Sequence, residues 1–313
     1  MDLGGTKVAC AIASDAGELL AKESIPTRSS EGPAAVLESI ANLVKELSEG
    51  RNPAALGMGV PGLVDLERGL TRFLPNFPGH WRDVPVAETL STELRCPVFL
   101  LNDARLATLG ELHFGHGRGA GTMVLLTLGT GIGGGVVVDG VLRLGPLGAA
   151  GELGHQTVLP DGPRCGCGSR GCLETLASGP AIAGEGVRLL LSGLAPKLHE
   201  LTDGDAGKVN PKLMAQAALA GDEMVRQAIL RAAGYLGIGV SNLITALHPE
   251  LVVLTGGVAA MGDLLIEAVR AEVRERVRMF PPDTVRIERS VLADKAGLWG
   301  GIALARQGGI AGR

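Results

Sequence analysis

The chain has 313 residues, of which 46% are apolar, 20% charged and 3% aromatic; this length predicts two domains or one large one, with a core that needs no disulfide bonds. Its 48 glycines show no three-residue period and lie in short clusters between apolar runs, which excludes collagen and extended disorder. The net charge is 29 − 33 = −4 without a block of Lys or Arg, so nucleic acid is not an expected partner.

The first half of the chain predicts alternating strands and helices. The segment 33–48 carries apolar residues at spacings of three and four, which predicts an amphipathic helix. The buried strand 97–101 is followed directly by Asn102 and Asp103, and the helix 104–114 comes next. The expected elements are the turn 2–7, the strands 8–13, 56–60 and 97–101, and the helices 33–48 and 104–114.

A glycine-rich joint over 115–121 separates this half from a second one that repeats its opening. The predicted strand 123–128, the turn Gly129-Thr130-Gly131 and the strand 133–138 match the pattern at the N-terminus. Later elements are expected at 222–247 (helix), 251–254 (buried strand) and 295–306 (helix). Strands that alternate with helices predict an α/β architecture, and two similar halves around a joint predict two lobes with a cleft.

Three glycine turns follow or precede apolar strands and contain threonine: Gly4-Gly5-Thr6, Gly129-Thr130-Gly131 and Thr255-Gly256-Gly257. Glycine lacks the Cβ that would keep backbone N–H groups away from phosphate oxygens, so such turns can hold a nucleotide. No P-loop or dinucleotide-binding glycine motif is present in the sequence. Each turn alone is equally well explained as an ordinary hairpin turn, and the set of three favours phosphate binding.

Four metal-ligand residues lie close together in the sequence: His155, Cys165, Cys167 and Cys172. One His and three Cys are the ligand set of a closed, structural zinc site, and glycines between them let the backbone wrap. A local disulfide or three free thiols are the alternatives, but Cys165 and Cys167 are too close for an unstrained bridge. The odd total of five cysteines also favours a cytoplasmic protein with a metal site over a secreted one.

Acidic residues stand at both ends of this metal loop. Glu152 precedes His155, and Glu174 follows Cys172, so a bound metal gathers two carboxylates and an imidazole suited to polyol hydroxyls. The alternative is that both are ordinary surface charges. Asp103 is a second candidate, because it lies where a strand gives way to a helix; it could serve only as a helix cap, but its polar neighbour Asn102 favours a site.

With these motifs assembled, the chain resembles the ROK family (repressors, open reading frames and sugar kinases), and within it the bacterial glucokinases. The motifs that carry the resemblance run from the N-terminus to the segment 294–301. They are Asp2-Leu3-Gly4-Gly5-Thr6-Lys7, Gly59-Val60-Pro61-Gly62, Leu101-Asn102-Asp103-Ala104, Leu128 to Gly135, Glu152-Leu153-Gly154-His155 and the cysteine loop ending in Cys172-Leu173-Glu174.

The resemblance implies a duplicated actin-like, ribonuclease-H-like fold in which ATP and a hexose meet between two lobes. Residues 1–117 with the C-terminal helix 297–313 are expected to form the small lobe, and 118–296 the large lobe with the zinc loop. The implied reaction is transfer of a phosphoryl group from ATP to the 6-hydroxyl of D-glucose, with Asp103 as catalytic base. Lobe closure about the joint 115–121 is expected to exclude water.

Further roles follow from the resemblance, residue by residue. The implied sugar ligands are Gly62, Asn76, Asn102, Asp103, Glu152, His155 and Glu174. The implied ATP-binding residues are Gly4, Gly5, Thr6, Lys7, Thr130, Gly131, Gly256 and Gly257, with Asp2 near Mg²⁺. A structural Zn²⁺ is implied on His155, Cys165, Cys167 and Cys172.

Two departures from the family pattern qualify these expectations. Only Met1 precedes Asp2, so either the true start lies upstream or the first strand is cut short. No helix-turn-helix precedes Asp2, which disfavours a sugar-sensing repressor. Kinases of N-acetylmannosamine or N-acetylglucosamine remain alternatives, whereas a chaperone-type or cytoskeletal ATPase would not need the zinc loop. A cytoplasmic homodimer or homotetramer is expected, with no membrane partner.

Overall fold

The computed structural model describes residues 1–14, 16–75 and 77–310. The chain forms two compact units, and it passes between them several times. The first unit consists of Met1–Gly119, Leu142–Ala150 and Asp294–Arg313, and the second of Ala120–Val141 and Gly151–Ala293. The first crossing therefore falls inside the glycine-rich joint.

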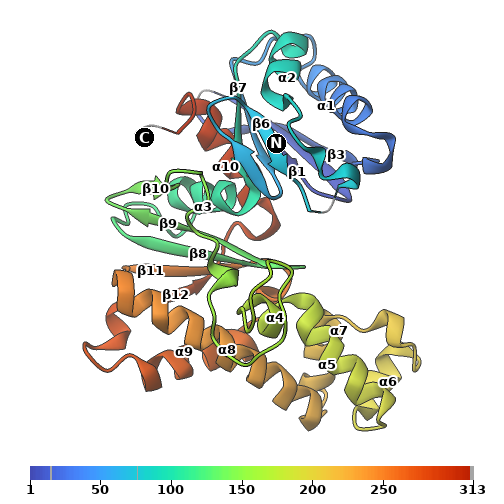
Figure 1. Cartoon of the computed structure of the whole chain (residues 1–313), viewed down its shortest axis with the longest axis vertical. Helices are drawn as coiled ribbons and strands as arrows, with labels where there is room; N and C mark the ends of the chain where they lie inside the picture. The colour runs from blue at the N-terminus through green and yellow to red at the C-terminus, as the bar shows by residue number, and fades with distance from the viewer. Residues whose placement is uncertain (15, 76, 311–313) are drawn as a thin grey trace. The chain divides into compact units, whose positions relative to one another are not determined.

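The first unit is built on a five-stranded sheet in the order β3-β2-β1-β4-β7 (Figure 1). Strands β1, β4 and β7 run parallel to one another, whereas β2 and β3 continue the sheet antiparallel. The strands are β1 (Asp2–Leu3), β2 (Lys7–Ala13), β3 (Leu19–Pro26), β4 (Leu56–Val60) and β7 (Val98–Asn102), beside the small hairpin β5 (Leu63–Asp65) and β6 (Leu70–Phe73).

Helices cover this sheet and close its core. Buried side chains of α1 include Ile40, and those of α2 include Leu90; they join Met58 of β4 in one apolar cluster. The helices of the unit are α1 (Pro33–Leu47), α2 (Val86–Leu94), α3 (Asp103–Phe114) and α10 (Ala296–Arg306), with the short 3₁₀ turns η1 (Ser29–Glu31), η2 (Pro78–Trp81) and η7 (Ala293–Lys295) at or near its edges.

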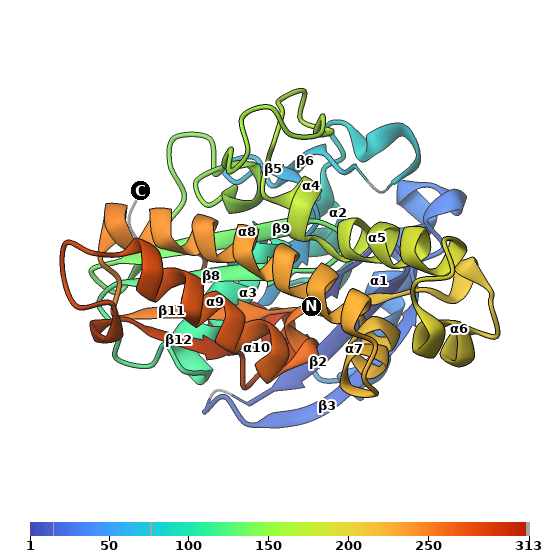
Figure 2. The ribbon, with the colours of Figure 1, turned by 90° about the horizontal axis from the view of Figure 1, so that it is seen from below.

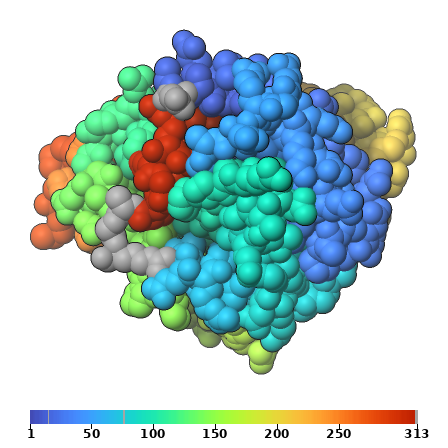
Figure 3. Space-filling view, turned by 90° about the horizontal axis from the view of Figure 1, so that it is seen from above, coloured from blue at the N-terminus to red at the C-terminus, as the bar shows by residue number. Residues whose placement is uncertain are grey.

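Helix α10 packs on α3 although the two are far apart in the sequence. A Cβ on Gly300 would lie 1.8 Å from the carbonyl oxygen of Leu106, so only glycine allows this approach. Gly110 makes the same close approach from α3, with Ala296 opposite it. In Figure 3, the red C-terminal segment accordingly lies among the blue and teal atoms of the N-terminal part.

The second unit repeats the first sheet. Its five strands lie in the order β10-β9-β8-β11-β12, with β8, β11 and β12 parallel and β9 antiparallel to β8. The order of the first three and last two strands along the chain is therefore the same in both sheets. The strands are β8 (Met123–Leu128), β9 (Ile132–Val138), β10 (Val141–Arg143), β11 (Leu251–Thr255) and β12 (Arg286–Arg289).

Helices occupy the connections between β10 and β11 and between β11 and β12. The longest of them, α8, packs beside α9, and both contribute to the core over strands β8 and β11, which are buried except for the half-buried Thr127 (Figure 2). The helices are α4 (Glu174–Ala177), α5 (Gly179–Leu191), α6 (Pro196–Thr202), α7 (Pro211–Leu219), α8 (Glu223–Leu247) and α9 (Asp263–Arg276), with 3₁₀ turns η3 (Leu153–His155), η4 (Ala206–Lys208), η5 (Ala259–Met261) and η6 (Pro282–Thr284).

Within the described part of the chain, α8 is the one helix long and apolar enough to cross a bilayer by length and composition. Buried residues make up 56% of its most apolar window. Its apolar side chains, such as Leu236 and Val240, belong to the core cluster of the second unit. The core therefore accounts for the composition of this helix.

The boundaries of the units differ from the predicted ones at three places. Residues 142–150 belong to the first unit and not to the lobe expected at 118–296, and the C-terminal part of the first unit begins at Asp294 and not at residue 297. The first segment of that unit ends at Gly119 and not at residue 117. The first difference has a physical cause: the Arg105 guanidinium on α3 donates hydrogen bonds to the carbonyl oxygens of Ala149 and Ala150.

Candidate active site and metal centre

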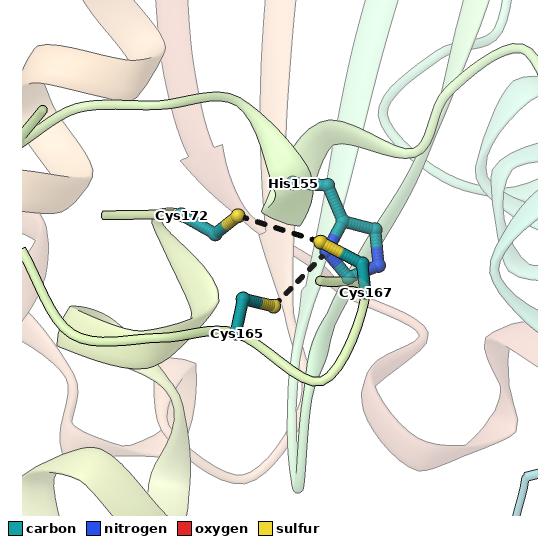
Figure 4. Close-up of side chains that lie close together, drawn as sticks. All are labelled: His155, Cys165, Cys167 and Cys172. Atoms are coloured by element: carbon teal, nitrogen blue, oxygen red, sulfur yellow. Dashed lines mark hydrogen bonds between the residues drawn. The ribbon is translucent and has the colours of Figure 1, made fainter. Parts of the chain in front are cut away.

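The structure brings the four predicted metal ligands together in the second unit. Figure 4 shows the side chains of His155, Cys165, Cys167 and Cys172 close together. One ligand atom from each lies within 4.8 Å of the other three. Cys167 Sγ lies 3.7 Å from Cys172 Sγ, and His155 Nδ1 lies 3.5 Å from Cys165 Sγ. A tetrahedral zinc ion with Zn–S bonds of about 2.3 Å places its sulfur atoms about 3.8 Å apart, so the cluster fits the metal.

The three thiols of the loop are available to a metal ion. All three cysteines of the loop are free of disulfide bonds. Burial raises the pKa of Cys165 to about 12, and burial likewise raises the pKa of Cys172. A thiolate is the form that binds zinc, and a metal ion lowers the cost of forming it. Of the alternatives, the disulfide is not formed, and the convergence of four ligand atoms favours a metal site over three unrelated thiols.

Glycines shape the metal loop at two positions. Gly168 and Gly171 have φ values of +95° and +62°, and a Cβ on Gly171 would lie 1.6 Å from the Leu159 carbonyl oxygen. The third glycine of the loop, Gly166, does not have a positive φ and has open space around its Cβ position. Of the glycines predicted to let the backbone wrap, Gly168 and Gly171 therefore have that role in the structure, and Gly166 does not.

The imidazole of His155 lies between two carboxylates. Its Nε2 is 3.8 Å from Glu152 Oε2, and its Nδ1 is 3.9 Å from Glu174 Oε1. The side chains of Glu152 and Glu174 are 39% and 27% exposed, so both carry oxygen atoms that a ligand can reach. The structure therefore brings together the three polar residues that the ends of the metal loop were predicted to gather. Nδ1 faces the thiols, which leaves Nε2 on the side of Glu152.

Glu174 also contacts the glycine turn between β8 and β9, a link that the sequence analysis did not predict. Its Oε2 accepts a hydrogen bond of 3.1 Å from the Ile132 amide. A Cβ on Gly131 would lie 2.4 Å from the same oxygen, so the turn has room for this carboxylate only because residue 131 is glycine. One side chain thus joins the metal loop to the turn that carries Thr130.

The two glycine turns of the second unit lie at the same edge of its sheet. β8 and β11 are parallel neighbours, with Thr127 opposite Thr255, so the turns that follow them are adjacent. Gly256 has φ +94°, and a Cβ there would lie 2.5 Å from the Leu128 carbonyl oxygen. Ligands of α/β sheets bind beyond the carboxyl ends of parallel strands, which is where Thr130, Gly131, Gly256 and Gly257 are found.

The first unit has a matching glycine turn between β1 and β2. The Gly4 amide donates to the Lys7 carbonyl at 2.9 Å, and Thr27 closes the turn by donating its hydroxyl to the Gly4 carbonyl at 2.6 Å. Gly5, Thr6 and Lys7 are exposed. The turn therefore presents its backbone and a cationic side chain to solvent.

Asp2 lies beside the start of α3. A Cβ on Gly59 of the neighbouring strand would lie 3.5 Å from Asp2 Oδ1 and 3.6 Å from Asp103 Cα. A Cβ on Gly297 would lie 2.7 Å from Asp2 Oδ2. Burial raises the pKa of Asp2, and a nearby cation would favour its charged form. Small residues on both sides thus leave room for this carboxylate near Asp103.

Asn102 and Asp103 have different roles at the junction of β7 and α3. Asn102 is the N-cap, and its side-chain oxygen accepts from the amides of Ala104 at 3.0 Å and Arg105 at 3.3 Å. Its side-chain nitrogen donates to the Gly62 carbonyl at 3.0 Å. Asp103 is the first residue of the helix and is exposed. Asp103 Oδ1 also accepts a hydrogen bond from the Ala104 amide at 2.8 Å, so its carboxylate contacts the first turn of the helix. The N-cap position itself belongs to Asn102, and the alternative that Asp103 is the N-cap is therefore wrong.

The remaining predicted ligand, Asn76, lies outside the described residues. Gly62, expected near the sugar, has φ +85°, and a Cβ there would lie 2.0 Å from the Phe73 carbonyl oxygen. Glycine at this position lets the loop after β4 turn sharply and present the carbonyl that orients Asn102.

The sequence and the fold both match known proteins. The model of the ROK family matches residues 1–308. This chain belongs to the ROK family. A glucokinase of Thermotoga maritima is 38% identical to the ROK chain over 310 residues, which cover 98% of this chain and 96% of that protein.

Solved structures of ROK proteins agree with the duplicated fold. The ROK family glucokinase of Streptomyces griseus, in complex with glucose and AMPPNP, is 33% identical with a TM-score of 0.84, and the match covers 98% of both chains. The ROK hexokinase of Thermus thermophilus is 36% identical with a TM-score of 0.78, and the match covers 98% of this chain and 96% of that one. The fold of this ROK chain is therefore the duplicated actin-like, ribonuclease-H-like α/β fold.

Proposed function

We propose that this ROK chain is an ATP-dependent hexokinase whose substrate is D-glucose. The observation that carries the proposal is the set of two carboxylates on either side of the His155 imidazole, held at the ends of the metal loop. Such a set can accept and donate hydrogen bonds to neighbouring hydroxyls of a pyranose. The glucose-bound structure of the Streptomyces griseus relative supports the choice of sugar.

The proposed hexose ligands come from both units of the chain. Asn102, Asp103 and Gly62 belong to the first unit, where Asn102 donates a hydrogen bond to the Gly62 carbonyl. Asn76 is proposed as a further ligand because the resemblance to the family implies it. Glu152, His155 and Glu174 belong to the second unit. Amide, imidazole and carboxylate groups give the site both donors and acceptors, so it can distinguish hydroxyls by position.

Asp103 is the proposed catalytic base. Its exposure at the start of α3 lets its carboxylate contact a ligand, and the neighbouring N-cap fixes the backbone that carries it. Phosphoryl transfer passes through a loose transition state, which needs positioning and charge neutralisation more than a strong base. Asp103 then orients the 6-hydroxyl toward the γ-phosphorus and accepts its proton as the new P–O bond forms. The bond between the γ-phosphorus and the oxygen that bridges it to the β-phosphorus breaks in the same step, and ADP leaves.

The glycine turns are the proposed nucleotide-binding segments. In the first unit these are Gly4, Gly5, Thr6 and Lys7, and in the second they are Thr130, Gly131, Gly256 and Gly257. Their glycines carry no Cβ, so backbone N–H groups can come close to the phosphate oxygens and to the adenosine. Asp2 is the residue proposed to hold Mg²⁺, directly or through water, and the ion would neutralise charge on the phosphates.

The zinc site has a structural role in this proposal. His155, Cys165, Cys167 and Cys172 supply four protein ligands, which leaves no open coordination position for a substrate. When bound, zinc cross-links the loop rigidly and takes no part in the reaction. The chain's own contribution is to hold Glu152 and Glu174 where a hexose can meet them.

The sugar specificity is tested by a coupled assay of ADP formation. ATP consumption is measured with glucose, mannose, N-acetylmannosamine, N-acetylglucosamine and without sugar. We expect consumption that depends on the sugar and is fastest with glucose. A preference for an N-acetylated hexose would replace glucose by an amino sugar as substrate, and sugar binding without ATP consumption would favour a sugar-sensing regulator.

The same preparation tests the proposed assembly. We propose a cytoplasmic homodimer or homotetramer, because the resemblance to the bacterial glucokinases of the family implies such an assembly. Light scattering on the purified chain gives its mass in solution, and a monomer at working concentration would contradict this part of the proposal.

A further inference from the structure

Arg105 is a buried charged residue beside the proposed catalytic base. It lies in the first turn of α3, two positions after Asp103, and only 1% of it is exposed. Arginine is seldom fully buried unless its donors are satisfied, because removing the charge from water is costly. No sequence motif predicts a role for this residue, so its hydrogen-bond partners decide what it does.

One part of the guanidinium fixes the side chain of Asn102. Arg105 Nη1 donates to Asn102 Oδ1 at 2.8 Å, and the Arg105 amide donates to the same oxygen at 3.3 Å. With the Ala104 amide at 3.0 Å, this oxygen accepts three hydrogen bonds. These donors and the Gly62 carbonyl set which way the amide points. The second hydrogen on Asn102 Nδ2 is then the group that this side chain can offer to a sugar hydroxyl.

The other part of the guanidinium holds the chain that leads to Glu152. Nε donates to the Ala150 carbonyl at 2.9 Å, and Nη2 donates to the Ala149 carbonyl at 3.0 Å. Residue 150 is the last of the segment that belongs to the first unit, and Gly151, with φ +94°, begins the next segment of the second. Arg105 therefore anchors a crossing point two residues before Glu152.

We propose that Arg105 is a positioning residue for the hexose, an inference that rests on the proposed function. A single planar group orients Asn102 and fixes the backbone from which the chain continues to Glu152. The planar fork of arginine reaches three acceptors in different directions, whereas the ammonium of lysine is a compact charge on a flexible stem. Lysine at this position is therefore expected to keep the positive charge and to lose some of the hydrogen bonds that the guanidinium makes.

The experiment compares Arg105→Met and Arg105→Lys with the wild type. Leu109→Ala is the matched control, because Leu109 is a buried residue of the same helix and the site does not use it. Steady-state kinetics give KM for glucose and for ATP, thermal unfolding gives Tm, and hydrogen exchange by mass spectrometry follows peptides over 100–106 and 147–153. Each measurement uses the full chain.

Arg105→Met is expected to raise KM for glucose by about 10-fold or more, because the hydrogen bonds that orient the ligands are lost, while KM for ATP stays within about threefold. Arg105→Lys is expected to fall between wild type and Arg105→Met. Exchange is expected to accelerate over both peptides in Arg105→Met. Leu109→Ala is expected to lower Tm and leave KM for glucose near the wild-type value.

Equal changes in both KM values, or a glucose KM unchanged in folded Arg105→Met, would show that Arg105 only supports the fold. If Arg105→Met does not fold, Arg105→Lys decides alone by the same comparison. A wild-type protein without hexose-dependent ATP consumption would overturn the proposed function instead. In that case the exchange data still test the contacts, and unchanged exchange over both peptides in the variant would overturn the role of Arg105.

Discussion

At the scale of single residues, backbone contacts place the side chains of the site. Asn102 caps α3 and thereby leaves the exposed Asp103 carboxylate at the first position of the helix. Glu174 uses one oxygen on the Ile132 amide, and its other oxygen faces His155. In each case a conventional structural contact fixes the direction of a group that a ligand can use.

Gly131→Ala tests the contact between Glu174 and the glycine turn. The added methyl group would lie 2.4 Å from Glu174 Oε2, so the carboxylate must move away from its position beside His155. We expect KM for glucose to rise by about 10-fold, with little change in Tm because the end of a side chain can move at small cost. Steady-state kinetics and thermal unfolding measure the two quantities.

Gly129→Ala is the control for this variant. A methyl group there meets only the Gly131 carbonyl oxygen at 3.9 Å, an ordinary contact. It is expected to leave KM for glucose near the wild-type value. The same rise in both variants would mean that the stiffness of the turn matters and not the position of Glu174.

At the scale of elements, the metal loop is the part whose shape depends most on a bound ion. Its four ligands come from η3 and from the segment before α4, and Glu152 and Glu174 flank them. The loop is tied to its surroundings by backbone contacts such as Leu173 N–H to the Gln156 carbonyl at 3.0 Å. Loss of the ion is therefore expected to loosen both carboxylates while the helices of the second unit stay folded.

Cys167→Ala tests this dependence. We expect the variant to lose zinc, as measured by elemental analysis, and to show glucose binding weakened by about 10- to 100-fold, because the ligand-bearing loop slackens. KM for ATP is expected to rise as well, since Glu174 links the loop to the turn at Thr130.

Gly166→Ala serves as the control in the same loop. Its Cβ position has open space, so the variant is expected to keep zinc and normal kinetics. Normal glucose binding by zinc-free Cys167→Ala protein would show that the metal does not position the carboxylates.

The elements that carry strong local signals were predicted well, and their mutual contacts were not. Strand β7 and helix α3 meet at Asn102 and Asp103, as the apolar run and the polar pair indicated. The His and Cys spacing predicted a metal cluster because ligand type and count are local properties. By contrast, Arg105 resembles a surface charge in the sequence, since burial depends on distant partners at 149 and 150.

At the scale of the whole molecule, the chain is a duplication of one sheet. Both sheets place three meandering strands before two parallel ones, and in both a glycine turn joins the first two strands. The sequence predicted this repeat from its turns, because tight turns need glycine and so leave a mark. It did not predict that 142–150 returns to the first unit, since no local signal records which unit a connecting segment contacts.

The most direct test of the central claim is turnover and glucose binding in Asp103→Asn, compared side by side. The substitution keeps the shape of the side chain and removes its ability to accept a proton, so kcat is expected to fall by about 10²- to 10⁴-fold. Calorimetric affinity for glucose is expected to stay within a few-fold of the wild type, and Asp203→Asn, whose side chain is 82% exposed, is expected to retain full turnover. Full turnover in Asp103→Asn would contradict the account.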